Sequence, residues 1–77
     1  MTGLDWKTRL QELTAELGLG VPEYVLSYVG PHSRTTFTAR VSVNGEMFDP
    51  CEGRNRNKAE QAAAAMAWTV LSPRDRQ

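Results

Sequence analysis

The dipeptide Asn44-Gly45 is the feature that most constrains how this chain folds. It follows a run from Thr35 to Val43 in which apolar and polar residues alternate. A type I′ turn needs positive φ at both central residues, and Asn and Gly tolerate this conformation best. The turn therefore predicts that a strand from Glu46 to about Asp49 returns antiparallel to the run. The alternation predicts a half-buried strand whose inner face carries Phe37, Ala39, Val41 and Val43.

The residues before this hairpin predict a helix followed by another strand. Asp5 is a candidate N-cap, and the helix is expected from Trp6 to Leu17, before Gly18, Gly20 and Pro22. Its inner face is expected to carry Leu10, Leu13 and Leu17, which recur with helical spacing. The β-branched and aromatic run from Tyr24 to Val29 predicts a strand, which Gly30-Pro31 ends.

The residues after the hairpin predict a second helix. Asn55 is its candidate cap and Ser72-Pro73 its end. The predicted order is therefore helix, three strands, helix. The inner face of the second helix is expected to carry Ala59, Ala62, Ala63, Met66 and Val70.

Length and composition set limits on the class of protein. A chain of 77 residues is expected to form a single domain over residues 1–77, with a core of about 5–71 and a polar tail at 72–77. The single cysteine, Cys51, excludes an internal disulfide and favours a reducing, cytoplasmic setting. Neither a secretion signal nor a membrane span is expected, and no cofactor or metal site is predicted.

The charges balance overall but not locally. Nine basic and nine acidic residues give a formal net charge of +0, whereas Arg54, Arg56 and Lys58 lie close together with no acid between them. Binding to phosphates depends on such local charge, because screening limits its reach to ~10 Å. A basic cluster at the start of the second helix therefore indicates an anion-binding surface.

Linked motifs resemble one known family. They are Lys-Thr-Arg-Leu-Gln-Glu-Leu at 7–13, Pro-Glu-Tyr at 22–24, Gly-Pro at 30–31, Phe-Thr-Ala-Arg-Val at 37–41 and Gly-Arg-Asn-Arg-Asn-Lys-Ala-Glu-Gln-Ala-Ala-Ala at 53–64. From Asp5 to Leu71 the chain resembles a double-stranded-RNA-binding domain, and most of all the C-terminal domain of bacterial ribonuclease III. The resemblance implies an α+β fold of order αβββα, with a three-stranded antiparallel sheet and both helices packed on one face.

The resemblance also implies where RNA is bound. In the first helix, Thr8, Gln11 and Glu12 match positions that meet a minor groove. The loop with Pro31, His32, Ser33 and Arg34 matches the segment that enters the next minor groove. Phosphates of the major groove between them are expected to meet the start of the second helix, through Arg54, Arg56, Asn57 and Lys58.

Two positions depart from the family pattern. The family usually carries a histidine two residues after the proline, where this chain has Ser33, with His32 one place early. It also carries a basic pair at the second helix, of which Arg56 supplies the first member and Asn57 replaces the second. Arg54 or Lys58 is expected to supply the missing charge.

Plainer readings stand beside these assignments. The basic cluster can be solvated surface charge, His32 a solvated loop residue, and Gln11 and Glu12 an ordinary exposed helix face. The alternative function is a protein-interaction or dimerisation module of the same fold with weakened RNA binding. As a fragment the chain is expected to be a monomer.

An enzymatic function is not expected. The acids are scattered, whereas two-metal phosphodiester cleavage needs several carboxylates that converge on ions ~4 Å apart. Cys51 is expected in a loop after Pro50, with no activating base. If the parent protein is a ribonuclease III-type endonuclease, its catalytic domain lies outside these residues.

Overall fold

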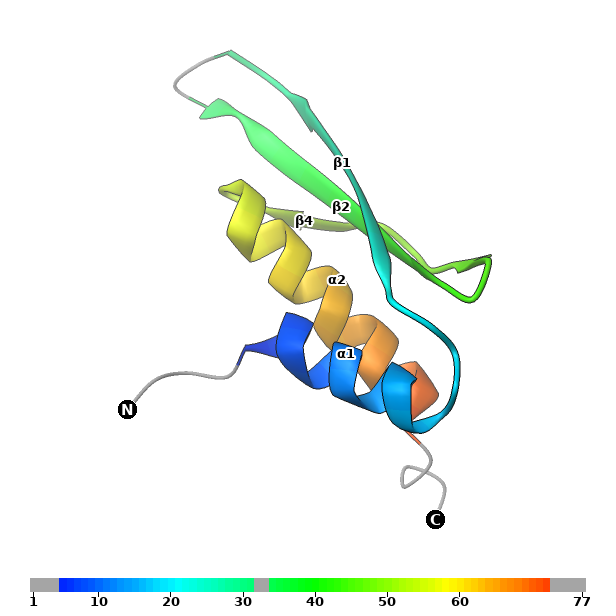
Figure 1. Cartoon of the computed structure of the whole chain (residues 1–77). Helices are drawn as coiled ribbons and strands as arrows, with labels where there is room; N and C mark the ends of the chain where they lie inside the picture. Colours follow the sequence, from blue (N-terminus) through cyan, green and yellow to red (C-terminus); the bar gives the residue numbers. More distant parts are fainter. Residues whose placement is uncertain (1–4, 32–33, 73–77) are drawn as a thin grey trace.

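A computed structural model describes residues 5–31 and 34–72 of the chain. Two helices cover one face of an antiparallel sheet, which confirms the predicted αβββα class (Figure 1). The elements follow in the order α1 (Trp6–Glu16), β1 (Glu23–Val29), β2 (Thr36–Val43), β3 (Glu46–Met47), β4 (Cys51–Gly53) and α2 (Arg56–Leu71).

The predicted hairpin lies at the expected residues. Val43 of β2 pairs with Glu46 of β3 across a two-residue turn. Asn44 has φ of 53° and Gly45 has φ of 84°, as a type I′ turn requires. β1 pairs with the other side of β2 over its whole length, from Glu23 opposite Ser42 to Val29 opposite Thr36.

The third strand is interrupted, which corrects the prediction of one strand ending near Asp49. β3 pairs Met47 with Ser42, and β4 pairs Cys51 with Ala39, both on the same side of β2. The three residues between the two pieces lie opposite only two residues of β2, which is a β-bulge, and Pro50 within it has no N–H to donate. Cys51 therefore lies in β4 and not in a loop.

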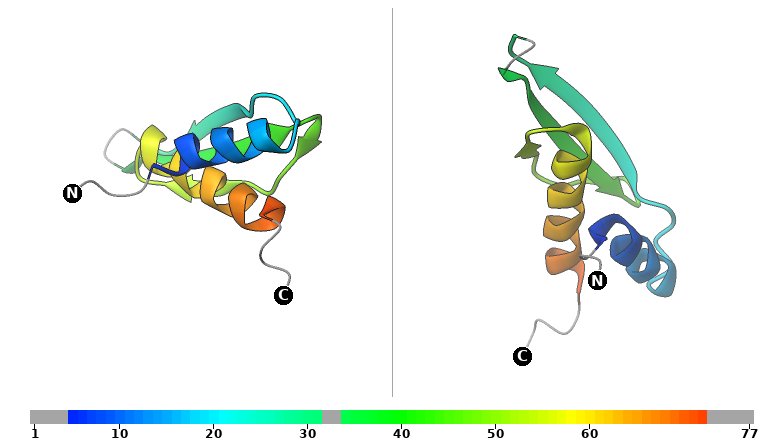
Figure 2. Two further views of the ribbon diagram at one scale, coloured as in Figure 1. Left: turned by 60° about the horizontal axis from the view of Figure 1, so that its bottom comes forward. Right: turned by 90° about the vertical axis from the view of Figure 1, so that its left-hand side faces the viewer.

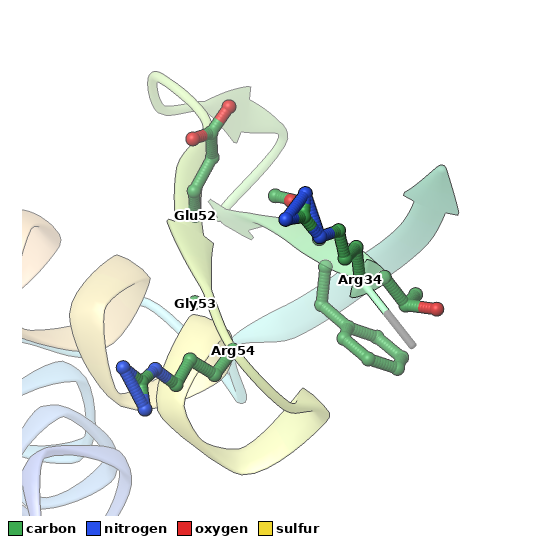
Figure 3. A pocket seen from close by; sticks show the side chains of 7 residues that line it. Arg34, Glu52, Gly53 and Arg54 are labelled. Atoms are coloured by element: carbon green, nitrogen blue, oxygen red, sulfur yellow. The ribbon is translucent and has the colours of Figure 1, made fainter. Parts of the chain in front are cut away.

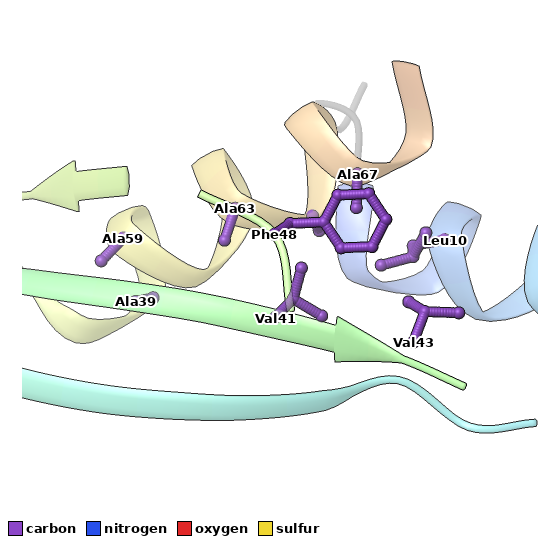
Figure 4. Close-up of a cluster of buried hydrophobic side chains, with 9 residues drawn as sticks. Leu10, Ala39, Val41, Val43, Phe48, Ala59, Ala63 and Ala67 are labelled. Atoms are coloured by element: carbon purple, nitrogen blue, oxygen red, sulfur yellow. The ribbon is translucent and has the colours of Figure 1, made fainter. Parts of the chain in front are cut away.

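The bulge turns Phe48 into the core between the sheet and the helices (Figure 4). The N–H of Phe48 still donates to the carbonyl of Val41 at 2.9 Å. The expected inner face of β2 is confirmed for three buried residues, and Phe37 packs against them partly buried. The three are Ala39, Val41 and Val43.

The buried face of α2 differs from the predicted one. Ala59 and Ala63 are buried as predicted, and Met66 packs partly buried against the core. Val70, however, is 63% exposed, and Ala62 is only partly buried. An alanine-rich helix has little polarity to show which stripe faces inward, and α2 contacts both the sheet and α1, so its buried face is broad. That face carries Ala59, Glu60, Ala63, Ala64 and Ala67.

The inner face of α1 is confirmed at Leu10 and Leu13 and wrong at Leu17, which is 42% exposed. The helix ends at Glu16, and Gly18 reverses the chain with φ of 70°. The N–H of Leu19 then donates to the carbonyl of Thr14 at 2.8 Å. Leu19 thus packs against the core in place of Leu17.

Candidate functional site

Three exposed surfaces follow one another along one side of the molecule. The right-hand view of Figure 2 looks onto this side and shows the ends of β1 and β2 at the top, the start of α2 below them and α1 below that. The β1–β2 hairpin extends beyond the N-terminus of α2, which Figure 1 shows from another direction. The resemblance places its three groups of contact residues on these surfaces.

The first surface is the connection between β1 and β2. Gly30 has φ of 109°, and a Cβ there would lie 2.7 Å from the carbonyl oxygen of Arg34, so only glycine fits. The carbonyl of Pro31 accepts the Arg34 N–H and the Thr35 hydroxyl, each at 2.9 Å. These two bonds hold exposed Arg34 at the hairpin end. The predicted contact residues His32 and Ser33 lie outside the described residues.

The second surface is the N-terminus of α2. The side-chain oxygen of Asn55 accepts the backbone N–H of Lys58 at 2.8 Å, which confirms the predicted cap. The predicted contact residues around this N-terminus are all exposed; they are Arg54, Arg56, Asn57 and Lys58. The unpaired N–H groups of the first helical turn and the helix dipole favour an anion there.

Ion pairing leaves most of this positive charge available. Arg56 Nε lies 3.8 Å from Glu60 Oε2, and the Arg56 side chain is 69% exposed, so that pair is loose. In the part of the chain that the structure describes, Arg54 and Lys58 form no ion pair. The charge is therefore free to meet phosphates.

Gly53 places this N-terminus close to the sheet. A Cβ on Gly53 would overlap the backbone of Lys58 and Ala59, with 2.8 Å to the carbonyl carbon of Lys58. A hollow lies between β4 and the end of the β1–β2 hairpin (Figure 3). Arg34 lines it from the hairpin, and Glu52, Gly53 and Arg54 line it from the other side. The first and second surfaces therefore meet at this hollow.

The third surface is α1, where Thr8, Gln11 and Glu12 are exposed. The Thr8 hydroxyl donates to Asp5 Oδ2 at 2.8 Å. Asp5 occupies the predicted N-cap position, but its carboxylate makes no cap bond to the helix backbone. Asp5 is therefore the N-cap residue, as predicted, and the helix begins after it, but its carboxylate is used mainly by the side chains of Thr8 and Gln61.

Gln61 of α2 is a residue that the sequence did not single out. Its Oε1 accepts the backbone N–H of Trp6 at 2.6 Å, and its Nε2 donates to Asp5 Oδ1 at 2.8 Å. The bond from Gln61, followed by that from Thr8, lowers the pKa of the Asp5 carboxyl. The side chain of Gln61 therefore joins the third surface to the helix that carries the second.

Lys7 and Glu60 form a second link between the helices. Lys7 Nζ lies 2.6 Å from Glu60 Oε1, and Glu60 is almost fully buried. Lys7 also lies over the ring of Tyr24, with 5.4 Å to the centroid. Tyr24 is partly buried against the core, and this burial, followed by the charge of Glu60, raises its pKa to about 12.

Arg9 covers an aromatic pair where the helices meet. Trp6 and Trp68 pack edge to face with 5.6 Å between ring centroids. The guanidinium carbon of Arg9 lies 5.2 Å from the Trp6 ring and 5.4 Å from the Trp68 ring. Both indoles are partly buried, so this cluster is part of the helix–helix packing.

The described residues offer little for catalysis. Burial raises the pKa of the Cys51 thiol, and Asp49 adds to this, so the thiol stays protonated and unreactive at neutral pH. Within residues 5–31 and 34–72 no group of three or more His, Cys, Asp or Glu side chains is arranged to hold a metal ion. Over the same residues, neither helix has the length and apolar character to span a bilayer.

Comparisons with known proteins agree on one family. Residues 6–71 match the family described as the double-stranded RNA binding motif. Ribonuclease 3 of Streptomyces coelicolor is 54% identical over 69 residues, which is 90% of this chain and 25% of that protein. Ribonuclease 3 of Mycobacterium tuberculosis is 49% identical over 73 residues, 95% of this chain and 30% of that protein. The chain thus spans less than a third of the length of these relatives.

Solved structures show the same likeness. The structure of Arabidopsis HYL1 superposes with a TM-score of 0.78 at 34% identity, over 87% of this chain and 96% of that one. The first double-stranded-RNA-binding domain of DRB4 superposes with a TM-score of 0.79 at 26% identity, over 92% of this chain and 100% of that one. The match covers the helices and the sheet together.

Proposed function

Because the chain belongs to the double-stranded RNA binding motif family, we propose that it binds double-stranded RNA across two minor grooves and the major groove between them. It is a binding domain and not a catalytic one. We further propose that residues 1–77 act as one domain and that any cleavage, as in the ribonuclease 3 relatives, resides in another part of a longer protein.

The observation that carries this proposal is the order of the three surfaces along one side (Figure 2). A duplex presents a minor groove, a major groove and a minor groove in succession along one side. The basic N-terminus of α2 lies between the other two surfaces, where the phosphates that border the major groove are expected. α1 and the β1–β2 connection, on either side of it, are proposed to enter the minor grooves.

Each surface offers the chemistry that its groove requires. Thr8, Gln11 and Glu12 present polar groups to 2′-hydroxyls and base edges of the first minor groove. Arg34, with Pro31 and the two residues between them, is proposed to enter the second. The proposed phosphate contacts come from Arg54, Arg56, Asn57 and Lys58.

Titration of the chain with a 20-base-pair RNA duplex by fluorescence anisotropy tests the proposal. RNA should bind much more tightly than DNA of the same sequence, because DNA lacks 2′-hydroxyls and has different groove widths. If about three cations act, log K should fall with log salt with a slope of roughly −2 to −3. Equal affinity for RNA and DNA would contradict recognition of A-form RNA.

Light scattering on the same samples tests the competing function. The formal net charge of +0 and the replaced contact positions Ser33 and Asn57 motivate a protein-interaction or dimerisation module. A monomer that binds RNA supports the proposed function. A dimer that is indifferent to RNA supports the competing one.

A further inference from the structure

A chain of three hydrogen bonds runs from the backbone of α1 through α2 to the Thr8 hydroxyl. Its first member is the Trp6 N–H, which can only donate, and its acceptor is Gln61 Oε1 at 2.6 Å. An amide that offers its oxygen to Trp6 must turn its nitrogen to the other side. That nitrogen, Nε2, donates to Asp5 Oδ1 at 2.8 Å.

The directions of these hydrogen bonds also determine whether the Thr8 hydroxyl donates or accepts. An ionised carboxylate only accepts hydrogen bonds, and Asp5 accepts one on each oxygen. The bonds from Gln61 and Thr8 lower the pKa of Asp5, so the carboxylate is ionised at neutral pH. The Thr8 hydroxyl therefore donates its single proton to Asp5 Oδ2 at 2.8 Å and keeps only lone pairs for other partners.

We propose that Asp5 is a positioning residue that fixes the Thr8 hydroxyl as a hydrogen-bond acceptor and so selects a donor, the ribose 2′-hydroxyl, on the bound strand. This rests on the proposed function, in which Thr8 faces a minor groove. A 2′-hydroxyl both donates and accepts, so it satisfies an acceptor at this position. A 2′-deoxy sugar offers nothing there.

An ordinary N-cap explains only part of the arrangement. The backbone N–H groups of Lys7 and Thr8 help to lower the pKa of Asp5, but their effect is smaller than that of the side chains of Gln61 and Thr8, and neither forms a cap hydrogen bond of full geometry. The Trp6 N–H at the start of α1 is instead satisfied by Gln61, from the other helix. Each Asp5 oxygen accepts one side-chain hydrogen bond, and one of the two donors is the exposed Thr8.

Asp5→Asn tests the proposal because it should reverse the direction of the hydrogen bond between residue 5 and the Thr8 hydroxyl without changing the shape of the side chain at residue 5. Gln61 is held by Trp6, so its Nε2 still needs an oxygen, and the Asn side chain must present its NH₂ group to Thr8. The Thr8 hydroxyl would then accept from Asn and turn its proton outward. Thr8→Val, at an exposed position, removes the hydroxyl altogether.

The measurement is the affinity ratio between two 20-base-pair duplexes of one sequence, one of ordinary RNA and one fully 2′-fluoro-substituted. Fluorine keeps the A-form sugar pucker but carries no proton to donate. The wild-type chain should prefer ordinary RNA, and both variants should reduce that ratio by roughly threefold to tenfold, the range of one hydrogen bond. Asp49→Asn, the same charge change at an exposed site, should leave the ratio as in wild type.

Each contrary outcome has its own meaning. Suppose that the wild-type chain prefers RNA to DNA, but both variants keep the wild-type ratio of affinities for ordinary and 2′-fluoro RNA. The proposal that Asp5 fixes the Thr8 hydroxyl as an acceptor is then wrong, and the proposed function stands. If Asp5→Asn lowers the ratio and Thr8→Val does not, Asp5 does not act through Thr8, which also overturns the proposal. If the wild-type chain fails to bind RNA, the proposed function fails and this inference fails with it.

Discussion

Gln61 Oε1 accepts the backbone N–H of Trp6 at 2.6 Å, so the first turn of α1 is capped by a side chain from α2. The two residues are 55 positions apart in the sequence. The first N–H groups of a helix have no partner within it, and water or a side chain must satisfy them. This bond therefore couples the folding of α1 to the docking of α2.

Gln61→Leu should destabilise the fold by about 1–3 kcal/mol, because it removes a partly buried acceptor of the Trp6 N–H and a donor to Asp5. Urea denaturation followed by circular dichroism measures this loss. Gln11→Leu, the same change on the exposed face of α1, should alter stability by no more than about 0.5 kcal/mol. Equal losses would argue against a capping role for Gln61.

Leu10→Ala should cost about 2–5 kcal/mol, because Leu10 is fully buried between the helices and the sheet. Leu17→Ala should cost less than about 1 kcal/mol, since this side chain is 42% exposed after the end of α1. Both variants remove the same side-chain atoms, so the midpoints of their urea denaturation compare the two positions directly. A large loss of stability in Leu17→Ala would show that Leu17 lies on the buried face of the first helix, as its spacing predicted.

Tyr24 should make the fold less stable at alkaline pH. Its pKa is raised from 10.0 to about 12, so its contribution is fully present below pH 10.0 and is lost as the pH rises toward about 12. Tyr24→Phe should flatten this decline with little loss at neutral pH, because the buried hydroxyl has no hydrogen-bond partner among the described residues.

Ultraviolet absorbance of tyrosinate and denaturation at several alkaline pH values check this expectation. Tyr28→Phe is the matched control, because the Tyr28 ring is exposed on the same strand. The late absorbance step should persist in Tyr28→Phe and vanish in Tyr24→Phe. The reverse result would show that the buried ring is not the group that titrates late.

Arg56→Ala combined with Lys58→Ala should weaken binding roughly tenfold or more for any RNA duplex sequence, because phosphates carry no sequence information. The slope of log K against log salt should become shallower by about 2. Arg40→Ala removes an exposed cation of β2, together with its 3.3 Å hydrogen bond to the Phe48 carbonyl, and should change neither quantity. Anisotropy titrations at several salt concentrations measure both, and an unchanged affinity in the double variant would remove these residues from the interface.

The sequence predicted the elements well where a local signal specified them. Asn44-Gly45 required its turn, Asn55 its cap, and the alternation in β2 its buried residues. Each of these features depends on the backbone preference or the polarity of residues close together in the chain. The bounds of both helices were also predictable, because residues close to each end signal where a helix begins and stops.

Features that depend on contacts between distant residues were not predictable. The bulge before β4 arises from register with β2, and the broad buried face of α2 arises from α1 lying beside it. Gln61 stands among alanines in α2, with no local sign that it caps another helix. In the candidate site the sequence indicated the exposed residues, whereas the side chains that hold them in place became evident only in three dimensions.

The bulge between β3 and β4 also limits strand addition at one edge of the sheet. A long, flat edge strand presents a row of free N–H and C=O groups on which another molecule can add a strand. Here that edge consists of pieces of two and three residues, separated by a segment with Pro50. An incoming strand would find no continuous ladder, so this edge is a poor template for aggregation.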